Sequence, residues 1–272
     1  MRRALLLLAT TLLTAGCAAP AAEVRVEELR RPEEPPSAPL KVEPTAPADM
    51  PEAVDEGDRI LSFLTPRGIT AAVRFRQTAR SIGAPNRGAL EGGACLAPKG
   101  PGFVHVSRSS CGTDEMVAIV QWALREMQRE YPKTAPVVVG ALSKPGGGRL
   151  RPHKSHRSGR DIDLGLYATG NQHLPHFQPL PIERIDFKKT FLLMAYLISS
   201  GRVTNIFVNH RLQPYLYEAA RSMGYDRQQL DYLFEWPRGA KSRQGLIRHE
   251  RGHMKHFHVR FACPDGNSGC VE

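Results

Sequence analysis

The stretch His153–Gly165, HKSHRSGRDIDLG, decides the fold of this chain and concentrates its polar chemistry. Its last part, the DIDL tetrad at 161–164, alternates acidic and apolar residues, which is typical of a half-buried strand. Both carboxylates then face one side of the strand. His156 precedes Asp163 by seven residues, with Gly159 between them. A loop histidine followed by a strand aspartate directs N and O ligands at one metal ion, and this donor set suits zinc.

A second stretch near the C-terminus, HFHVRF at His256–Phe261, has the same period of two. Its two histidines and its arginine share one face, and its aromatic and aliphatic residues share the core face. We expect the strands that carry Asp163 and His258 to lie side by side. With His156 they would place two histidines and one carboxylate on the metal. The fourth position would stay open for water, as in a catalytic zinc site.

A competing motif, HERGH at 249–253, matches the HExxH pattern of zincins. That pattern needs a helix, so that both histidines share one face. Gly252 is a poor interior helix residue and a strand is expected almost immediately afterwards, which favours a chance match. A variant keeps the first two ligands but uses Glu250 as the base and His253 as the third ligand.

The N-terminus has the pattern of a secretory signal over residues 1–16. Two arginines precede an apolar run from Ala4 to Leu13, and small residues follow. The run is too short to span a bilayer. Cys17, after Ala-Gly, resembles a bacterial lipobox, which implies cleavage before this cysteine and a lipid on it; ordinary signal cleavage nearby is the alternative. Ala18 favours the outer membrane, so we expect a periplasmic, outer-membrane-anchored lipoprotein.

Residues 17–58 are rich in Pro and Glu and contain no aromatic residue, which predicts a disordered tether. Residues 59–272 have the composition of one globular domain, and this domain contains both histidine motifs. The tether holds four basic and eleven acidic residues, while the whole chain carries a net charge of +10, so the domain is strongly basic. A basic domain suits an anionic partner, and export favours cell wall or a lipid surface over nucleic acid. Plain solubility is the alternative explanation.

Besides Cys17, the chain has four cysteines, an even number in an oxidising compartment: Cys95, Cys111, Cys263 and Cys270. The last two close a short loop and are expected to be bridged, which would leave Cys95 with Cys111. Four cysteines allow three connectivities, and the sequence alone does not choose among them. The lack of a C-x-x-C pair argues against a zinc ribbon.

Elements placed around the two motifs predict an α+β fold, in which a small antiparallel sheet bears the zinc site and helices flank it. Thr113 can cap a first helix over about 114–130. The Gly- and Pro-rich segment Ser81–Phe103 is expected to form loops. The remaining predictions are strands at 136–142, 206–208 and 256–261 and helices at about 187–199, 214–223 and 228–234.

Four segments together resemble the penicillin-insensitive murein endopeptidases of the MepA type. They are GGGRLRPHKSHRSGRDIDLG, GHMKHFHVRFACP, the GPGF loop and NIFVNHRLQP. That family is part of a zinc peptidase superfamily that includes lysostaphin-type and D-Ala-D-Ala peptidases. The resemblance covers roughly Ser81 to Cys270, which is nearly the whole expected domain.

The resemblance implies one zinc ion and cleavage of D-Ala–meso-diaminopimelate cross-links in peptidoglycan. The metal ligands would be His156, Asp163 and His258. His256 would lie near the water that the metal activates, where it could take up a proton and pass it to the leaving amine. His153 and His253 match further active-site histidines, either of which could stabilise the oxyanion. No acyl-enzyme is needed, so β-lactams should not inhibit.

The sequence leaves several alternatives open. The protein could be a D,D- or L,D-carboxypeptidase that trims unlinked stems, or a non-catalytic wall-binding module. Lys188 and Lys189 stand where a histidine would follow Asp186 in an Asp-x-x-His pair, which argues against a second metal. Asp161 could contact the substrate or a histidine behind the metal, but a structural role is favoured, for instance in a pair with Arg157 or Arg160. Four histidines without partners at ligand spacing are expected on the surface or in loops, namely His105, His173, His176 and His210.

Overall fold

The computed structural model describes residues 57–272. The predicted signal segment, the predicted lipidation site at Cys17 and the predicted tether up to residue 56 lie outside the described residues. Within the described part of the chain, no helix is both long enough and apolar enough to cross a bilayer.

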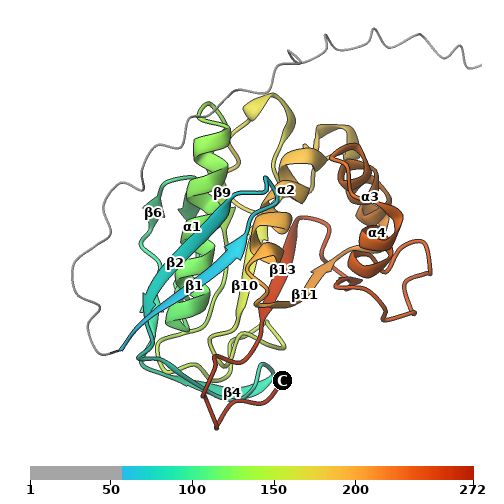
Figure 1. Ribbon diagram of the computed structural model, residues 1–272. Coiled ribbons are helices and arrows are strands. Elements are labelled where there is room, and N and C mark those ends of the chain that lie inside the picture. Colours follow the sequence, from blue (N-terminus) through green and yellow to red (C-terminus); the bar gives the residue numbers. More distant parts are fainter. Residues whose placement is uncertain (1–56) are drawn as a thin grey trace, which may run out of the picture. The chain divides into compact units, whose positions relative to one another are not determined.

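A seven-stranded sheet with the order β12-β11-β13-β10-β9-β7-β6 forms the centre (Figure 1). Its strands are β6 (Lys99–Gly100), β7 (Phe103–His105), β9 (Val137–Val139), β10 (Asp161–Gly165), β11 (Val203–Val208), β12 (Ile247–His249) and β13 (His256–Phe261). The α+β class is confirmed, but the sheet that was expected to be antiparallel is mixed. The pairs β7–β9 and β11–β12 are parallel. Parallel neighbours need crossover connections, which α1 and the α3–α4 segment supply.

The predicted alternation is observed in the antiparallel pair of β10 and β13. Asp163 lies opposite His258, and Asp161 lies opposite Arg260. The intervening residues are fully buried in the main core: Ile162, Leu164, Phe257 and Val259. This pair of strands therefore separates an apolar face, which packs in the core, from a polar face that carries the candidate site.

The helices follow the predicted bounds to within one residue: α1 (Asp114–Glu130), α2 (Phe187–Ser199), α3 (Gln213–Ser222) and α4 (Arg227–Leu233). Local capping explains this accuracy, because Thr113 accepts from Met116 N, Asp186 from Lys189 N and Asp226 from Gln229 N. Figure 1 shows α3 and α4 beside the β11 end of the sheet. Three short 3₁₀ turns complete the helical elements of residues 57–272: η1 (Thr169–Asn171), η2 (Ile182–Arg184) and η3 (His210–Leu212).

The segment Ser81–Phe103, expected to form loops, contains strands instead. β3 (Arg80–Ala84) and β4 (Arg87–Glu91) form a hairpin, and β5 (Ala94–Cys95) pairs with β8 (Cys111–Gly112). These strands are short and rich in turn residues, so no hydrophobic period identified them. A further hairpin, β1 (Asp58–Leu64) with β2 (Thr70–Arg76), packs on α1 (Figure 1).

Both expected disulfide bonds are present, Cys95–Cys111 and Cys263–Cys270. The first joins β5 to β8, directly before α1. The second closes the C-terminal loop, which returns to β3: Gly83 N donates to Gly269 O and Val271 N donates to Gly83 O. The C-terminus accordingly lies beside β4 in Figure 1.

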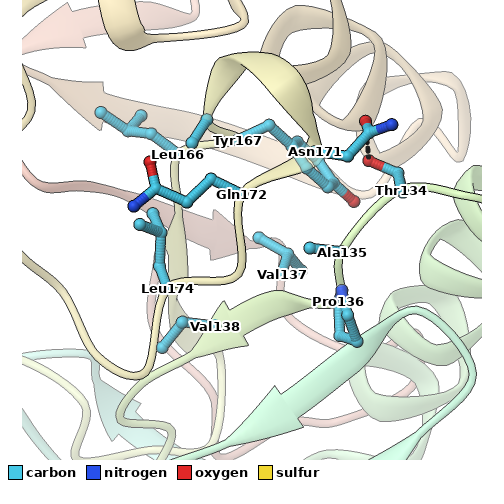
Figure 2. A pocket seen from close by; sticks show the side chains of 11 residues that line it. Thr134, Ala135, Pro136, Val137, Val138, Leu166, Tyr167, Asn171, Gln172 and Leu174 are labelled. Carbon is cyan, nitrogen blue, oxygen red and sulfur yellow. Dashed lines mark hydrogen bonds between the residues drawn. The ribbon is translucent and has the colours of Figure 1, made fainter.

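A small pocket lies between β9 and the segment that follows β10 (Figure 2). Thr134 Oγ1 donates to Asn171 Oδ1 at its rim, over 3.4 Å. Its lining is largely apolar side chains and contains neither a histidine nor a carboxylate. This pocket therefore lacks the side chains that bind metals or transfer protons. Such side chains lie on the polar face of β10 and β13.

Candidate metal centre

An open cleft covers the polar face of β10 and β13. Its walls come from the turn after β3, the loop before β10, the end of β11 and the turn before β13. It brings together every histidine that the sequence assigned to the site, together with Asp163: His153, His156, His253, His256 and His258.

Asp163 is the hub of this cleft and is almost completely buried. Its Oδ1 lies 3.0 Å from His258 Nδ1, 3.3 Å from His156 Nε2 and 3.8 Å from His256 Nε2. Its Oδ2 lies 3.6 Å from His153 Nδ1. One carboxylate and four imidazoles therefore converge on a single small volume.

Two overlapping sets of ligand atoms lie within 4.8 Å of one another: His153, His156 and Asp163, and Asp163, His253 and His256. Asp163 belongs to both. His258 belongs to neither, although its Nδ1 lies closer to Asp163 than any other imidazole nitrogen does. Distance alone thus favours Asp163 as a candidate ligand. It does not distinguish among the histidines, which differ in their hydrogen bonds.

Asp161 provides that distinction, because it binds the far nitrogen of His258. Its Oδ1 lies 3.0 Å from His258 Nε2 and accepts from Arg260 Nε over 2.8 Å, and its Oδ2 accepts from His156 N over 2.8 Å. A carboxylate behind a histidine fixes its tautomer and orients the opposite nitrogen toward a metal. Asp161 therefore holds His258 Nε2, and His258 Nδ1 faces Asp163.

The expected pairing of Asp161 with Arg157 or Arg160 is wrong. Residues next to each other in a strand point to opposite faces, so Arg160 points away from Asp161. Its fully buried guanidinium donates to Phe261 O over 3.1 Å and pairs with Glu272 over 3.0 Å. Arg260, which lies opposite Asp161 in the strand register, pairs with Asp161 instead.

The loop that carries His156 is held in a constrained conformation. His156 has a positive φ of 64°, which is uncommon for a residue other than glycine. Its carbonyl accepts from Ser143 Oγ, which also accepts from Gly159 N. At Gly159, with φ 77°, a Cβ would lie 2.7 Å from Leu90. His156 Nδ1 is buried without a hydrogen-bond partner among residues 57–272, while its Nε2 faces Asp163.

Phe177, which the sequence did not indicate, packs on His256. The two rings are stacked, with centroids 4.7 Å apart and planes 9° apart. Gly140 makes room for this contact, because a Cβ there would lie 2.5 Å from Phe177. The aromatic ring fixes the plane of His256 and shields one face of it from water.

The motif at 249–253 does not form a helix, so the zincin interpretation is wrong. His249 ends β12, the following residues form a turn, and Gly252 has a φ of 91°. His249 accepts from His210 N and is absent from the cleft lining. Glu250 and His253 do line the cleft, so the variant that uses them as base and ligand remains compatible with the geometry.

Two other histidines differ from expectation. His105 lies in β7 rather than in a loop, and its Nε2 is 3.0 Å from Gly140 O. His210 begins η3, where its Nδ1 is buried. His173 and His176 are exposed, as expected. None of the four lines the cleft.

Burial and charge divide the histidines into two groups. Burial lowers the pKa of His153 and His253, and it lowers the pKa of His256 to about 4. At His258 burial acts in the same direction, but Asp161 and Asp163 outweigh it and raise the pKa to about 9. The imidazoles hold the pKa of Asp163 well below its ordinary value, against the effect of burial. His256 is therefore neutral at pH 7.

The model of one protein family, described as penicillin-insensitive murein endopeptidase, matches residues 81–272. The chain belongs to this family. The matched segment contains all of the cleft histidines and both disulfide bonds, and it begins after the β1–β2 hairpin. The resemblance inferred from the motifs is thereby confirmed.

Curated relatives carry the same name, penicillin-insensitive murein endopeptidase. The Haemophilus influenzae protein is 28% identical over 207 residues, covering 71% of this chain and 66% of the relative. A Yersinia pestis protein is 28% identical over 159 residues, covering 53% and 52%. The Pectobacterium atrosepticum protein is 26% identical over 215 residues, covering 72% and 69%. The match thus spans between about half and two thirds of the length of these relatives.

Proposed function

We propose that this protein is a zinc-dependent peptidoglycan endopeptidase that hydrolyses D-Ala–meso-diaminopimelate cross-links and is insensitive to penicillin. One observation carries the proposal most directly. Asp163 and His258 face each other across β10 and β13, with His156 Nε2 3.3 Å from Asp163, in a cleft of a murein endopeptidase family member.

His156, Asp163 and His258 are the proposed metal ligands. Imidazole nitrogen and carboxylate oxygen are the donors that a catalytic zinc site uses, with three protein ligands and one open position. Two further features favour this set. Asp161 orients His258 from behind, and His156 Nε2 points at Asp163 from a conformationally constrained loop.

A zinc ion there would polarise the scissile carbonyl and lower the pKa of a water molecule to about 7. His256, neutral and held by Phe177, accepts the proton of the attacking water and delivers it to the leaving amine. His153 and His253 flank the cleft and donate hydrogen bonds to the developing oxyanion. No side chain forms a covalent bond with the substrate, so a β-lactam finds no serine to acylate.

Purified cross-linked muropeptides provide the test. We expect the complete chain to convert dimers to monomers, a chelator to abolish the reaction and zinc to restore it. His258→Ala should lose bound zinc, as measured by elemental analysis. Full activity after exhaustive metal removal would refute zinc dependence. Release of D-Ala from unlinked stems, with dimers left intact, would favour the carboxypeptidase alternative, and no cleavage of either would favour a binding module.

Two substitutions distinguish His256 from Glu250 as the general base. If His256 takes the proton, His256→Ala should reduce kcat by about 10²- to 10⁴-fold, whereas Glu250→Gln should have a mild effect. The reverse ranking would assign the base to Glu250, with His253 as the third ligand. The pH dependence of kcat/KM for each variant provides a second measurement.

The proposed location is the periplasm, with the domain anchored to the outer membrane by a lipid on Cys17. The family's substrate and the N-terminal signal pattern support this proposal. Cells that express the chain should incorporate radioactive palmitate into it, and Cys17→Ser should abolish the label. A labelled Cys17→Ser variant, or an unlabelled wild type, would contradict lipidation.

A further inference from the structure

A second groove adjoins the catalytic cleft, on the side of β11 and β12. The two hollows share Phe207 and Glu250 as a common wall. Three cations line the second groove, Lys241, Arg243 and Arg248, and we refer to it as the basic groove. Neither the family description nor the site proposed above accounts for it.

The sheet register connects the basic groove to the metal centre in one straight row. Asp163 lies opposite His258, His258 opposite Phe207, and Phe207 opposite Arg248. Residues directly opposite each other in a sheet point to the same face. Neighbouring strands are about 4.8 Å apart, so Arg248 lies roughly 14 Å from Asp163 along this row. An extended peptide covers that distance with about four residues.

The cations of the basic groove have no anionic partners in the described part of the chain. Many other arginines of residues 57–272 pair with a carboxylate, for example Arg67, Arg202 and Arg260. No such pair involves Lys241, Arg243 or Arg248; Arg248 Nε donates to Gly245 O instead. Two of the three, Lys241 and Arg243, are exposed. Their charges are therefore available to a ligand.

A buried carboxylate organises the groove without neutralising its surface. Glu235 is 1% exposed, accepts from Arg243 N over 2.9 Å and also accepts from His249 N. These contacts hold Arg243 at a positive φ of 54° and connect its loop to the end of β12. The carboxylate of Glu235 is thus hydrogen-bonded to backbone N–H groups. Among the residues that line the groove, the exposed anionic group is Glu250.

We propose that the basic groove binds a free carboxylate of one stem peptide, about four residues from the bond that is cleaved. This inference rests on the proposed endopeptidase function and adds to it a binding site for one group of the substrate. A substrate that extends on both sides of the cleaved bond needs a surface beyond the metal centre, and the row from Asp163 to Arg248 provides it. Phe207, against which Arg260 also packs, is part of the wall that the two hollows share.

The test compares a cross-linked muropeptide that has free carboxylates with the same muropeptide after amidation of those carboxylates. We expect the wild-type chain to prefer the free acid, with a kcat/KM ratio of about three- to tenfold, as for two solvent-exposed charge contacts. The double variant Lys241→Gln/Arg243→Gln should bring the ratio close to one, mainly through KM. Added salt should also bring the wild-type kcat/KM ratio closer to one.

A matched control removes two charges elsewhere. Arg125 in α1 and Lys133 just after it are exposed, and α1 packs on the opposite face of the sheet from the histidines. Arg125→Gln/Lys133→Gln should keep the wild-type ratio. A ratio that is equal in the wild type and the groove variant, or equally lowered in the control, would overturn the proposal.

A binding measurement separates this inference from the proposed function. Calorimetry on the complete chain after chelator treatment measures the affinity for both muropeptides without turnover. If the metal-loaded wild type cleaves neither muropeptide, the endopeptidase proposal fails, and the calorimetric preference for the free acid still decides the groove. If cleavage occurs but no preference is found in either assay, only the groove proposal fails.

Discussion

Asp161 shows how one buried carboxylate can organise a site that it does not enter. It accepts from the His156 backbone, from the His258 ring and from Arg260, and so connects the loop that precedes β10 to β13. Its neighbours hold its pKa below the ordinary value, even though burial acts in the opposite direction. Asp161 therefore remains charged throughout the range in which the protein is expected to work.

We predict that Asp161→Asn weakens zinc binding by about 10- to 100-fold, the usual cost of losing a partner behind a ligating histidine. Competition with a chromogenic chelator measures the dissociation constant directly. Asp163→Asn should be more severe, since it removes a proposed ligand. Equal zinc affinity in Asp161→Asn and the wild type would contradict an orienting role.

Phe177 packs on His256, the proposed base, as Asp161 binds His258. We predict that Phe177→Leu lowers kcat by about three- to tenfold, with a smaller change in KM, because His256 loses the ring that fixes its plane. Phe177→Tyr keeps the stacking and should therefore retain most of the wild-type kcat. A Leu variant with wild-type kcat would show that the stacking does not position His256.

At the level of residues, the sequence predicted the members of the cleft better than their contacts. Period-two alternation is local, so it correctly placed Asp163 and His258 on one face. The partner of Asp161 could not be found in this way, because Arg260 lies 99 residues further along the chain. Phe177 was missed for a related reason: it comes from an irregular segment, and only the folded chain brings it to His256.

Among the structural elements, α1, β11 and the C-terminal loop meet at Arg202. Its guanidinium pairs with buried Glu115 over 2.8 Å and with Asp265 over 3.0 Å, and it donates to Cys263 O over 2.7 Å. The start of α1 is therefore fixed to the disulfide loop by one side chain. Losing that side chain would leave a buried carboxylate without its main partner.

We predict that Arg202→Met destabilises the fold by about 3–5 kcal/mol, the cost of leaving a buried charge unpaired. Urea denaturation followed by circular dichroism measures this loss. The exposed pair Arg221–Glu218 is the control, and Arg221→Met should cost at most about 1 kcal/mol. Similar losses in both variants would show that Glu115 remains solvated.

Glu115 also predicts a pH dependence. Burial raises its pKa above the ordinary value of 4.5, and the attraction of Arg202 offsets this only in part. The folded state then binds the proton more tightly than the unfolded state, so stability falls as the pH rises from 4.5 through the folded-state pKa. The urea midpoint of Glu115→Gln, relative to the wild type, should increase across this interval. A constant difference between pH 4 and pH 7 would contradict the shift.

Helices were predicted well because their signals lie within a few residues of each other, as with the Thr113 cap before α1. The hairpin of β3 and β4 was missed because Gly and Pro concealed any hydrophobic period. The order of the sheet could not be derived either. The parallel pairing of β7 with β9 depends on how α1 packs, which a local pattern does not contain.

For the molecule as a whole, a metal that binds only the folded chain should raise its stability by mass action. We predict that chelator treatment lowers Tm and that excess zinc restores it, with a gain of about 2.7 kcal/mol at 100 times the dissociation constant. Differential scanning calorimetry measures the change. His258→Ala should lose most of this response, and a zinc-dependent Tm in that variant equal to that of the wild type would argue against His258 as a ligand.

The contact of Gly83 with Gly269 and Val271 brings together the two ends of the family-matched segment, which runs from 81 to 272. The ends of the family-matched segment thus meet in space, and the order in which its pieces are joined is separable from the fold. A circular permutant that links these ends and opens at the turn around Gly239 should assemble the same cleft. The β1–β2 hairpin precedes this segment in the chain, but it packs on α1 and buries Val73 in the main core, so the permutant should retain it.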